Sequence, residues 1–291
     1  MPIKGKKRNT IIGLLFVGAF IFGIFISTFI YKTKSLDTRA DTLALASKTI
    51  DDISDTKENL PLGTDLLGRA ELSYAGGTEG RNKNIEIGIK HIDGIVLKPG
   101  EEFSFKKAIG VVTAEEGYSE EKIFLNGEVT KGLGGGLCQI SSTLFRSVLD
   151  AGLQVTERHN HSYTVSRYDV GLDATYADPG PDFKFKNDLP DPIRISGKTE
   201  NQKVILELYG KSDGRVASTT EPEILSVIDF SPTKYVATST QFAHGQECFN
   251  TPQIGYVAKI MYSVLYPDGS TRVQDFVSKY KPLQRVCYIS I

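Results

Sequence analysis

The hydrophobic and polar positions along the chain fall into three successive patterns. Residues 11–31 form an uncharged apolar run, residues 32–68 are polar and rich in Asp, Lys and Thr, and the remainder alternates short apolar and polar segments. The first pattern is typical of a membrane helix, the second of a membrane-proximal stalk, and the third of a folded domain.

The apolar run is long enough to span a membrane. With a rise of about 1.5 Å per residue, a helix over residues 11–31 reaches roughly 30 Å, the thickness of the hydrocarbon core. A basic cluster between residues 4 and 8 precedes this run. It predicts that residues 1–10 are a cytoplasmic tail, that the helix contacts membrane lipid, and that the rest is extracytoplasmic. The alternative is a cleaved signal peptide, whose apolar region is usually shorter.

Residues 69–209 are predicted to form an α+β domain. Apolar residues recur at helical spacing over residues 84–92, and again from residue 138 to residue 149, shortly before Gly152. Segments that predict strands lie at residues 72–74, 95–97, 123–125, 154–156, 162–166, 172–176, 183–185, 193–195 and 204–208. This order predicts a helix that carries Cys138 and packs on an antiparallel sheet.

Residues 210–291 are predicted to form a small all-β module. The composition changes between residues 210 and 220, which marks a domain boundary. The tetrapeptide Tyr266-Pro267-Asp268-Gly269 is typical of a turn that joins two strands into a hairpin. The predicted strands lie at residues 224–228, 254–265, 271–276 and 286–291.

The overall charge excludes one class of partner. Lys and Arg nearly balance Asp and Glu, and the formal net charge is −1 over 291 residues. A nucleic-acid-binding domain usually carries a clear excess of basic residues. We therefore expect no nucleic-acid partner.

The three cysteines are Cys138, Cys248 and Cys287. In an extracytoplasmic compartment disulfides persist, and an odd number of cysteines leaves one thiol over. Because Cys248 and Cys287 both lie in the C-terminal module, we predict that they pair and that Cys138 stays free. The alternative is that all three thiols are reduced and buried.

A glycine-rich turn gives Cys138 a special position. The triplet Gly134-Gly135-Gly136 leads directly into the predicted helix, so the cysteine lies at the helix N-terminus. The positive end of the helix dipole favours a thiolate, which is the form that attacks carbonyl carbons. This position makes Cys138 a candidate nucleophile.

Residues after the helix supply the other groups that such a nucleophile needs. His161 is the predicted base, and Asp173, on the following predicted strand, would orient the imidazole. His159 is a reserve base because it shares a strand face with His161. Gln139, or backbone N–H groups at the helix start, would stabilise an oxyanion.

The residues also permit interpretations without catalysis. Cys138 could be an inert packing residue, and the two histidines could satisfy backbone carbonyls. His159 and His161 could instead ligate a metal ion, with Asp173 or Asp178 as a third ligand. The predicted thiol chemistry itself needs neither a metal nor another cofactor.

Several segments together resemble the VanW family, an accessory family of vancomycin B-type resistance found in bacteria with thick cell walls. The likeness covers roughly residues 72–208 and is carried mainly by the glycine-cysteine and histidine segments. The resemblance implies a role at the cell envelope. The matching segments are Phe103-Ser104-Phe105, Gly110, Gly117-Tyr118, Asn126-Gly127, Gly134–Leu144, Glu157–Ser162 and Asp173-Ala174-Thr175.

The arrangement also looks like a transglutaminase-type core with a papain-like fold, in which a helix bears the cysteine and strands bear the histidine and aspartate. That likeness implies that Cys138, His161 and Asp173 fill these three roles. One hypothesis is therefore an anchored thiol enzyme that acts on amide bonds of cell-wall peptides. The other is a non-catalytic envelope module that uses the same cleft to hold peptidoglycan or a partner.

Overall fold

The computed structural model describes residues 63–125, 128–248 and 251–291. The predicted cytoplasmic tail, membrane helix and most of the stalk lie outside these residues. In the part of the chain that is described, every helix is too short or too polar to cross a bilayer. The predicted end of the stalk, residue 68, falls within strand β1, which begins at Asp65.

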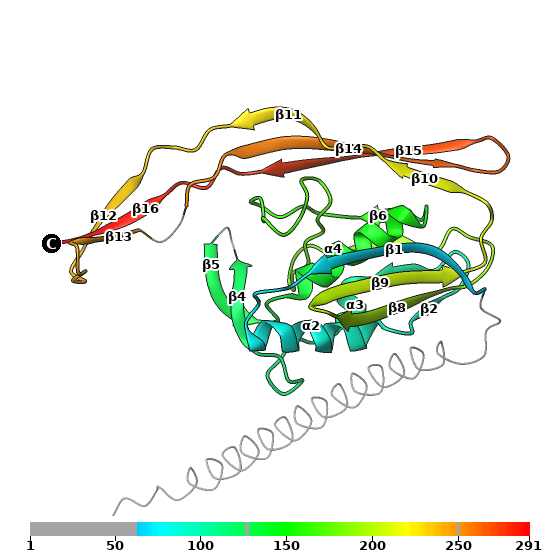
Figure 1. Cartoon of the computed structure of the whole chain (residues 1–291), viewed down its shortest axis with the longest axis horizontal. Helices are drawn as coiled ribbons and strands as arrows, with labels where there is room; N and C mark the ends of the chain where they lie inside the picture. Colours follow the sequence, from blue (N-terminus) through cyan, green and yellow to red (C-terminus); the bar gives the residue numbers. More distant parts are fainter. Residues whose placement is uncertain (1–62, 126–127, 249–250) are drawn as a thin grey trace, which may run out of the picture. The chain divides into compact units, whose positions relative to one another are not determined.

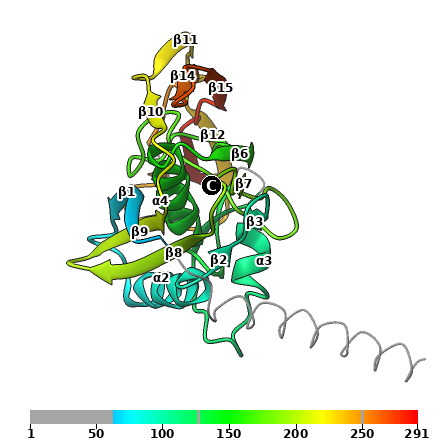
Figure 2. The ribbon, with the colours of Figure 1, turned by 90° about the vertical axis from the view of Figure 1, so that its right-hand side faces the viewer.

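Two helices pack on one face of an antiparallel sheet (Figures 1 and 2). They are α2, Glu79–Ile92, and α4, Leu137–Asp150. The backbones approach closely here: a Cβ on Gly68 of β1 would lie 2.4 Å from the carbonyl oxygen of Ser147 in α4. The four strands, in the order β1-β9-β8-β2, span Asp65–Ser73, Lys203–Gly210, Ile193–Glu200 and Val96–Leu97. The predicted helix on an antiparallel sheet is thus confirmed.

Helix α4 is buried on nearly all sides because other elements cover the face turned away from this sheet. The ring of Phe145 makes edge contacts with Phe183 and with Phe276, at centroid distances of 5.7 and 5.3 Å. Smaller elements complete this layer: the sheet β3-β7-β6 at Glu102–Ser104, Lys184–Lys186 and Gln154–Glu157, the short helix α3 at Phe105–Ile109, and the hairpin β4-β5 at Glu120–Leu125 and Glu128–Leu133. The fold is α+β, with three helices among the described residues.

The C-terminal strands share the hydrophobic core of the preceding domain. Ile260, Tyr262 and Phe276 belong to the same buried cluster as Phe145, and the Tyr262 hydroxyl donates to the Leu153 carbonyl at 2.9 Å. The predicted boundary near residue 210 therefore does not separate two cores.

The C-terminal strands form two sheets. The first sheet contains β10, β14, β11 and β15, at Val216–Thr219, Gly255–Leu265, Glu223–Ile228 and Thr271–Tyr280. The second sheet contains β12, β16 and β13, at Lys234–Thr238, Val286–Ser290 and Gln246–Cys248.

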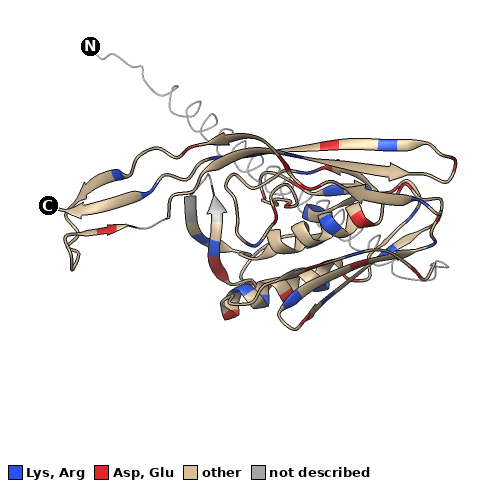
Figure 3. Cartoon of the chain, turned by 45° about the horizontal axis from the view of Figure 1, so that its top comes forward, with Lys and Arg blue, Asp and Glu red and all other residues tan. Residues whose placement is uncertain are grey.

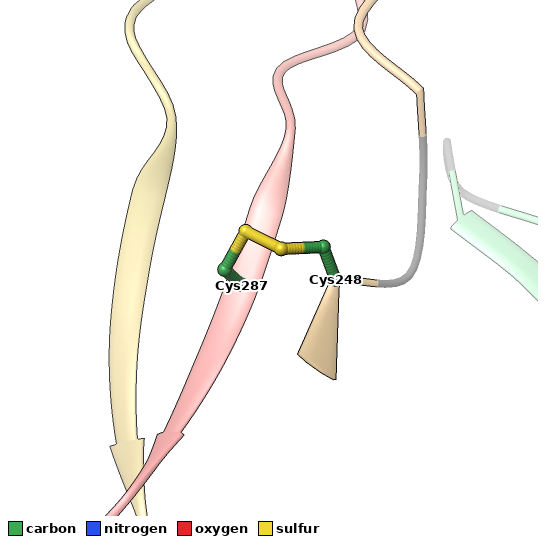
Figure 4. The surroundings of a disulfide bond; sticks show 2 residues. All are labelled: Cys248 and Cys287. Carbon is green, nitrogen blue, oxygen red and sulfur yellow. A yellow bond between two sulfur atoms is a disulfide. The ribbon is translucent and has the colours of Figure 1, made fainter. Parts of the chain in front are cut away.

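The predicted disulfide is confirmed. Cys248 of β13 and Cys287 of β16 lie opposite each other in an antiparallel pair and are bonded (Figure 4). Their Cα atoms are 4.0 Å apart, and Cys138 is free.

We expect the double variant Cys248→Ser, Cys287→Ser to lose about 2–4 kcal/mol of unfolding free energy, because the bridge limits the freedom of the unfolded chain. The two cysteines are separated by 39 positions, so the closed loop is long. Urea denaturation measures the change, with Cys138→Ser as the control for loss of a thiol. Equal midpoints for the double variant and the unsubstituted protein would contradict the prediction.

Candidate functional site

The glycine turn before α4 exists because side chains would not fit there. Gly134 and Gly136 have φ angles of +78° and +123°, which other residues rarely adopt. A Cβ on Gly135 would lie 2.6 Å from the Cβ of Glu121 in β4. The turn therefore delivers Cys138 to the second position of α4, at the helix N-terminus, as predicted.

The start of α4 has free backbone donors. Gly136, the residue that precedes the helix, offers no side chain to cap it. Within the described residues, the backbone N–H of Cys138 donates no hydrogen bond to a backbone or side-chain acceptor, whereas the N–H of Gln139 donates to Gly136. The thiol therefore lies beside an open N–H and the positive end of a helix dipole.

One polar side of α4 binds the segment that contains Asp173. The hydroxyls of Ser141 and Ser142 donate to the carbonyl of Ala174, and the Ala174 N–H donates back to Ser142 at 3.0 Å. The Cys138 sulfur continues this row: it donates to the Tyr176 carbonyl at 3.3 Å and accepts from the Tyr176 N–H at 3.5 Å. These contacts fix residues 173–176 against the helix.

The structure brings His161 and Asp173 together, but not on regular strands. The predicted strands at residues 162–166 and 172–176 are wrong, because both segments are irregular. Side chain–backbone bonds replace the ladder: the carboxylate of Asp173 accepts from the His161 backbone N–H at 2.7 Å and from its Nδ1 at 2.6 Å. Nearby, one backbone bond runs from the Thr175 N–H to the His159 carbonyl and another from the Lys281 N–H to the Ser162 carbonyl.

The imidazole of His161 joins Asp173 to the thiol. Its Nδ1 is used by Asp173, which leaves Nε2 as the ring nitrogen available to the Cys138 thiol. The two groups act on each other, because the imidazole lowers the thiol pKa and the thiol raises that of the imidazole. The ring of Tyr168 stacks on the imidazole at a centroid distance of 5.2 Å. His161 and Asp173 are 7% and 1% exposed and are therefore shielded from water, whereas Cys138 is half-buried.

Asp173 is held by residues from two other parts of the chain. Arg158 binds its Oδ1 at 3.0 Å and its backbone carbonyl at 2.6 Å, and also donates to Ser278 of β15. The hydroxyl of Tyr280, at the end of β15, donates to Oδ1 at 2.5 Å. The C-terminal hairpin thus contributes directly to the orientation of the carboxylate.

The charges of the three groups reinforce one another. Burial alone would raise the pKa of the Cys138 thiol, but the His161 hydrogen bond and charge, the Tyr176 N–H and the Arg81 charge lower it overall. Burial alone would lower the pKa of His161, but Asp173 and the thiol raise it to about 9. Burial opposes ionisation of Asp173 too, yet His161 and Arg158 hold its pKa below the usual value. These mutual shifts favour the thiolate–imidazolium pair over the neutral pair.

Two predicted site residues lie outside this arrangement. His159 is exposed, with 54% of its side chain accessible, and its Nε2 contacts Glu157 at 3.2 Å. It is not a reserve base on the same strand face, because that strand does not form. Gln139 is fully buried: its amide donates to the Ser73 carbonyl at 2.7 Å, and its Oε1 accepts from Arg81. Its amide is therefore not aimed at an oxyanion.

The described residues contain no group of three His, Cys, Asp or Glu side chains placed to hold a metal ion. Asp178, the alternative third ligand, lies 3.7 Å from the ammonium of Lys106. His159 and His161 bind different carboxylates, those of Glu157 and Asp173. The two histidines therefore do not act as a pair on one ligand.

Sequence reasoning missed Ser142, Arg158, Tyr168 and Tyr280. A signal existed for Ser142, because it lies one helical turn after Cys138 and therefore on the same side of α4. Arg158 immediately precedes the histidine pair and could have been suspected as a partner for a buried acid. Tyr280 had no such signal, because it is 107 positions from Asp173 and meets it only through the tertiary fold.

Comparison with known proteins places this site in a family. Residues 80–209 match the family described as VanW like protein. The chain is 39% identical over 148 residues to Uncharacterized protein YoaR of Bacillus subtilis strain 168. The aligned region covers 51% of this chain and 49% of that relative. Over 161 residues it is 29% identical to Vancomycin B-type resistance protein VanW of Enterococcus faecalis strain ATCC 700802 / V583, covering 54% of this chain and 56% of that relative.

The chain spans about half the length of these curated relatives. No solved structure matches it significantly. The matched residues 80–209 include the glycine turn, all of α4, His161 and Asp173, but not Tyr280. The resemblance found in the sequence is confirmed, because residues 80–209 match the VanW-like family and both relatives align with about half of the chain.

Proposed function

We propose that the protein is a cysteine-dependent acyl-transfer enzyme that cleaves or exchanges amide bonds. The observation that carries this proposal is the grouping of Cys138, His161 and Asp173 at the open N-terminus of α4, where His161 is bonded to Asp173 and acts on the thiol pKa. A nucleophile, a base beside it and a carboxylate bonded to the base are the parts that such chemistry requires. The order of these groups on a central helix and the following segments supports a transglutaminase- or papain-like mechanism.

The reaction begins from the thiolate–imidazolium pair. The Cys138 sulfur attacks the amide carbonyl carbon and forms a tetrahedral oxyanion, which the free N–H of Cys138 stabilises instead of Gln139. The C–N bond then breaks, and the His161 imidazolium gives its proton to the departing amine nitrogen, which leaves a thioester and a neutral imidazole.

The second half returns the enzyme to its starting state. The neutral imidazole of His161 takes a proton from water, and the hydroxide attacks the thioester carbonyl carbon. The C–S bond breaks, which yields a carboxylic acid, the Cys138 thiolate and the imidazolium. If an amine takes the place of water, the same steps form a new amide, so hydrolysis and transfer differ only in the second nucleophile.

The family and the covalent structure support a place at the cell envelope. The enterococcal relative is named for vancomycin B-type resistance. A disulfide between Cys248 and Cys287 is typical of extracytoplasmic proteins. Together with the apolar run at residues 11–31, this supports a single-pass membrane anchor with the catalytic part outside the cell. Peptides of the cell wall are then the accessible amide substrates.

The direct test uses purified Gram-positive cell walls as substrate. Incubation with the protein should release new free amino groups, measured with trinitrobenzenesulfonate, and Cys138→Ala should abolish their release. If the wild-type protein releases none but sediments with the walls, and Cys138→Ala sediments equally, the non-catalytic wall-binding module is the better account. His159→Ala is the matched control, because that histidine is exposed and outside the site.

A further inference from the structure

Two arginines near the start of α4 form no ion pair within the described residues. Arg81, in the first turn of α2, bonds to the neutral amide of Gln139 at 3.2 Å. Arg167 donates to the backbone carbonyl of Ala75 at 3.4 Å. Within the described residues neither guanidinium takes part in an ion pair, whereas Arg158, Arg215 and Arg272 all do.

Arg81 and Arg167 are close enough for their charges to interact near the glycine turn before α4. Arg81 lies within range of the charges of Arg167, Cys138 and Tyr168. Tyr168 directly follows Arg167 in the sequence, and its ring stacks on His161. Its side chain packs at the glycine turn, where a Cβ on Gly136 would lie 3.3 Å from the Arg81 Cγ. Glu121 is also within range of Arg81, although it makes no ion pair with it in the described part of the chain. The positive end of α4 adds to the same local field.

The local excess of positive charge contrasts with the rest of the protein. Lys and Arg residues are interspersed with Asp and Glu along the described helices and strands (Figure 3). The net charge of the chain is −1. Two guanidinium groups near the start of α4, neither in an ion pair within the described residues, are therefore a specific feature of this site.

Unpartnered polar atoms surround the same point. Within the described residues the buried Nε of Arg81 and the hydroxyls of Tyr118 and Tyr176 have no hydrogen-bond partner. Tyr176 is within range of both Tyr118 and Cys138. A buried donor without a partner is costly, typically about 1–3 kcal/mol, so such groups commonly serve a bound ligand. Two of these residues, Arg81 and Tyr176, act on the Cys138 thiol, so unpartnered polar atoms near it favour a polar ligand.

We propose that Arg81 and Arg167 bind a carboxylate of the substrate next to the Cys138 thiol. The inference rests on the proposed acyl-transfer function and narrows its substrate class. The amide bond attacked then lies within one or two residues of a free carboxylate, as the last amide bonds of a peptide do. Guanidinium groups suit this role because they bind carboxylates in a planar, two-bonded geometry.

Two alkylating reagents of similar size test this assignment. Iodoacetate carries a carboxylate next to the carbon that the thiolate attacks, and iodoacetamide carries a neutral amide there. The ratio of their rate constants cancels the fraction of thiolate, because both reagents react with the same ionised sulfur. The ratio therefore measures attraction for the carboxylate and is insensitive to thiol pKa.

We expect Arg81→Gln and Arg167→Gln each to lower the iodoacetate-to-iodoacetamide ratio by about threefold to tenfold, the effect of a unit charge several ångströms away in a partly hydrated site. Salt should lower the wild-type ratio as well, because it screens the attraction. The matched control is Arg194→Gln, whose guanidinium packs over the ring of Tyr209 on the sheet. Arg167 is exposed, so its variant keeps the test valid if Arg81→Gln fails to fold.

Unchanged ratios in both variants would overturn the inference. Equal slowing of both reagents would also overturn it, because the arginines would then act only on the thiolate. Neither result concerns the release of amines from cell walls, so the proposed function would stand. Conversely, a protein that releases no amines but shows the charge-dependent ratio would retain the anion site and lose the enzyme assignment.

Discussion

Substituting His161 with alanine is expected to slow the alkylation of Cys138 by iodoacetamide at pH 7 by roughly 30-fold, because a thiol of ordinary pKa is only about 3% ionised there. In the intact site the pKa of Cys138 is lowered by the bond and charge of His161, despite its burial. The pKa of His161 is raised to about 9, so the imidazolium persists through the neutral range. Alkylation of the wild-type protein should therefore remain fast below the usual thiol range.

The pH dependence of the alkylation rate shows in which direction His161 shifts the thiol pKa. A lowered thiol pKa means that the wild-type rate falls only when the pH drops below that lowered value. In His161→Ala the rate should instead rise through the ordinary thiol range, and the two proteins should converge at high pH. Second-order rate constants measured across pH, with intact mass spectrometry to locate the adduct, provide the profile.

Two control variants make this result specific. Asp173→Asn should shift the profile in the same direction but less, because it weakens the support of the imidazole without removing it. His159→Ala should leave it unchanged, because His159 is exposed and bonded to Glu157. If neither histidine substitution alters reactivity in a folded protein, the triad fails and a binding module becomes the better account.

A second large effect is expected from Arg158→Met, which should reduce the unfolding free energy by about 3–5 kcal/mol, because it removes one partner of a buried ion pair. Only 2% of the Arg158 side chain is exposed. It binds Asp173 twice, the Gly171 carbonyl and the Ser278 hydroxyl, so four acceptors lose a donor together. The melting temperature should fall by roughly 10 °C for a chain of this size.

Arg69→Met is the matched control for this prediction. Arg69 also pairs with acids, Glu71 and Glu207, but 43% of its side chain is exposed. Surface ion pairs contribute about 0–1 kcal/mol, so this variant should unfold almost normally. A loss below about 1 kcal/mol in Arg158→Met would mean that His161 and Tyr280 compensate the Asp173 charge without it.

The sequence alone determined the features that depend on local pattern. The four-residue recurrence after Cys138 predicts α4, because helical periodicity and a glycine turn are encoded within about 20 neighbouring positions. The pairing of Cys248 with Cys287 followed from the predicted extracytoplasmic location and from the odd number of cysteines. The order of Cys138, His161 and Asp173 also identified the three groups that meet, since the segment after a buried helix must return across it.

The tertiary structure decided how those groups are held. Residues 162–166 and 172–176 alternate like strands but do not pair as strands. Instead, Ser142 and Arg158 bind the backbone of residues 173–174, and the Asp173 carboxylate binds the backbone of His161. The alternation of strand faces therefore does not determine where the His159 side chain lies. Such side chain–backbone bonds compete with regular structure and depend on partners distant in sequence. The Tyr280 bond to Asp173 spans 107 positions, and only the packing of the C-terminal hairpin on α4 brings the two together.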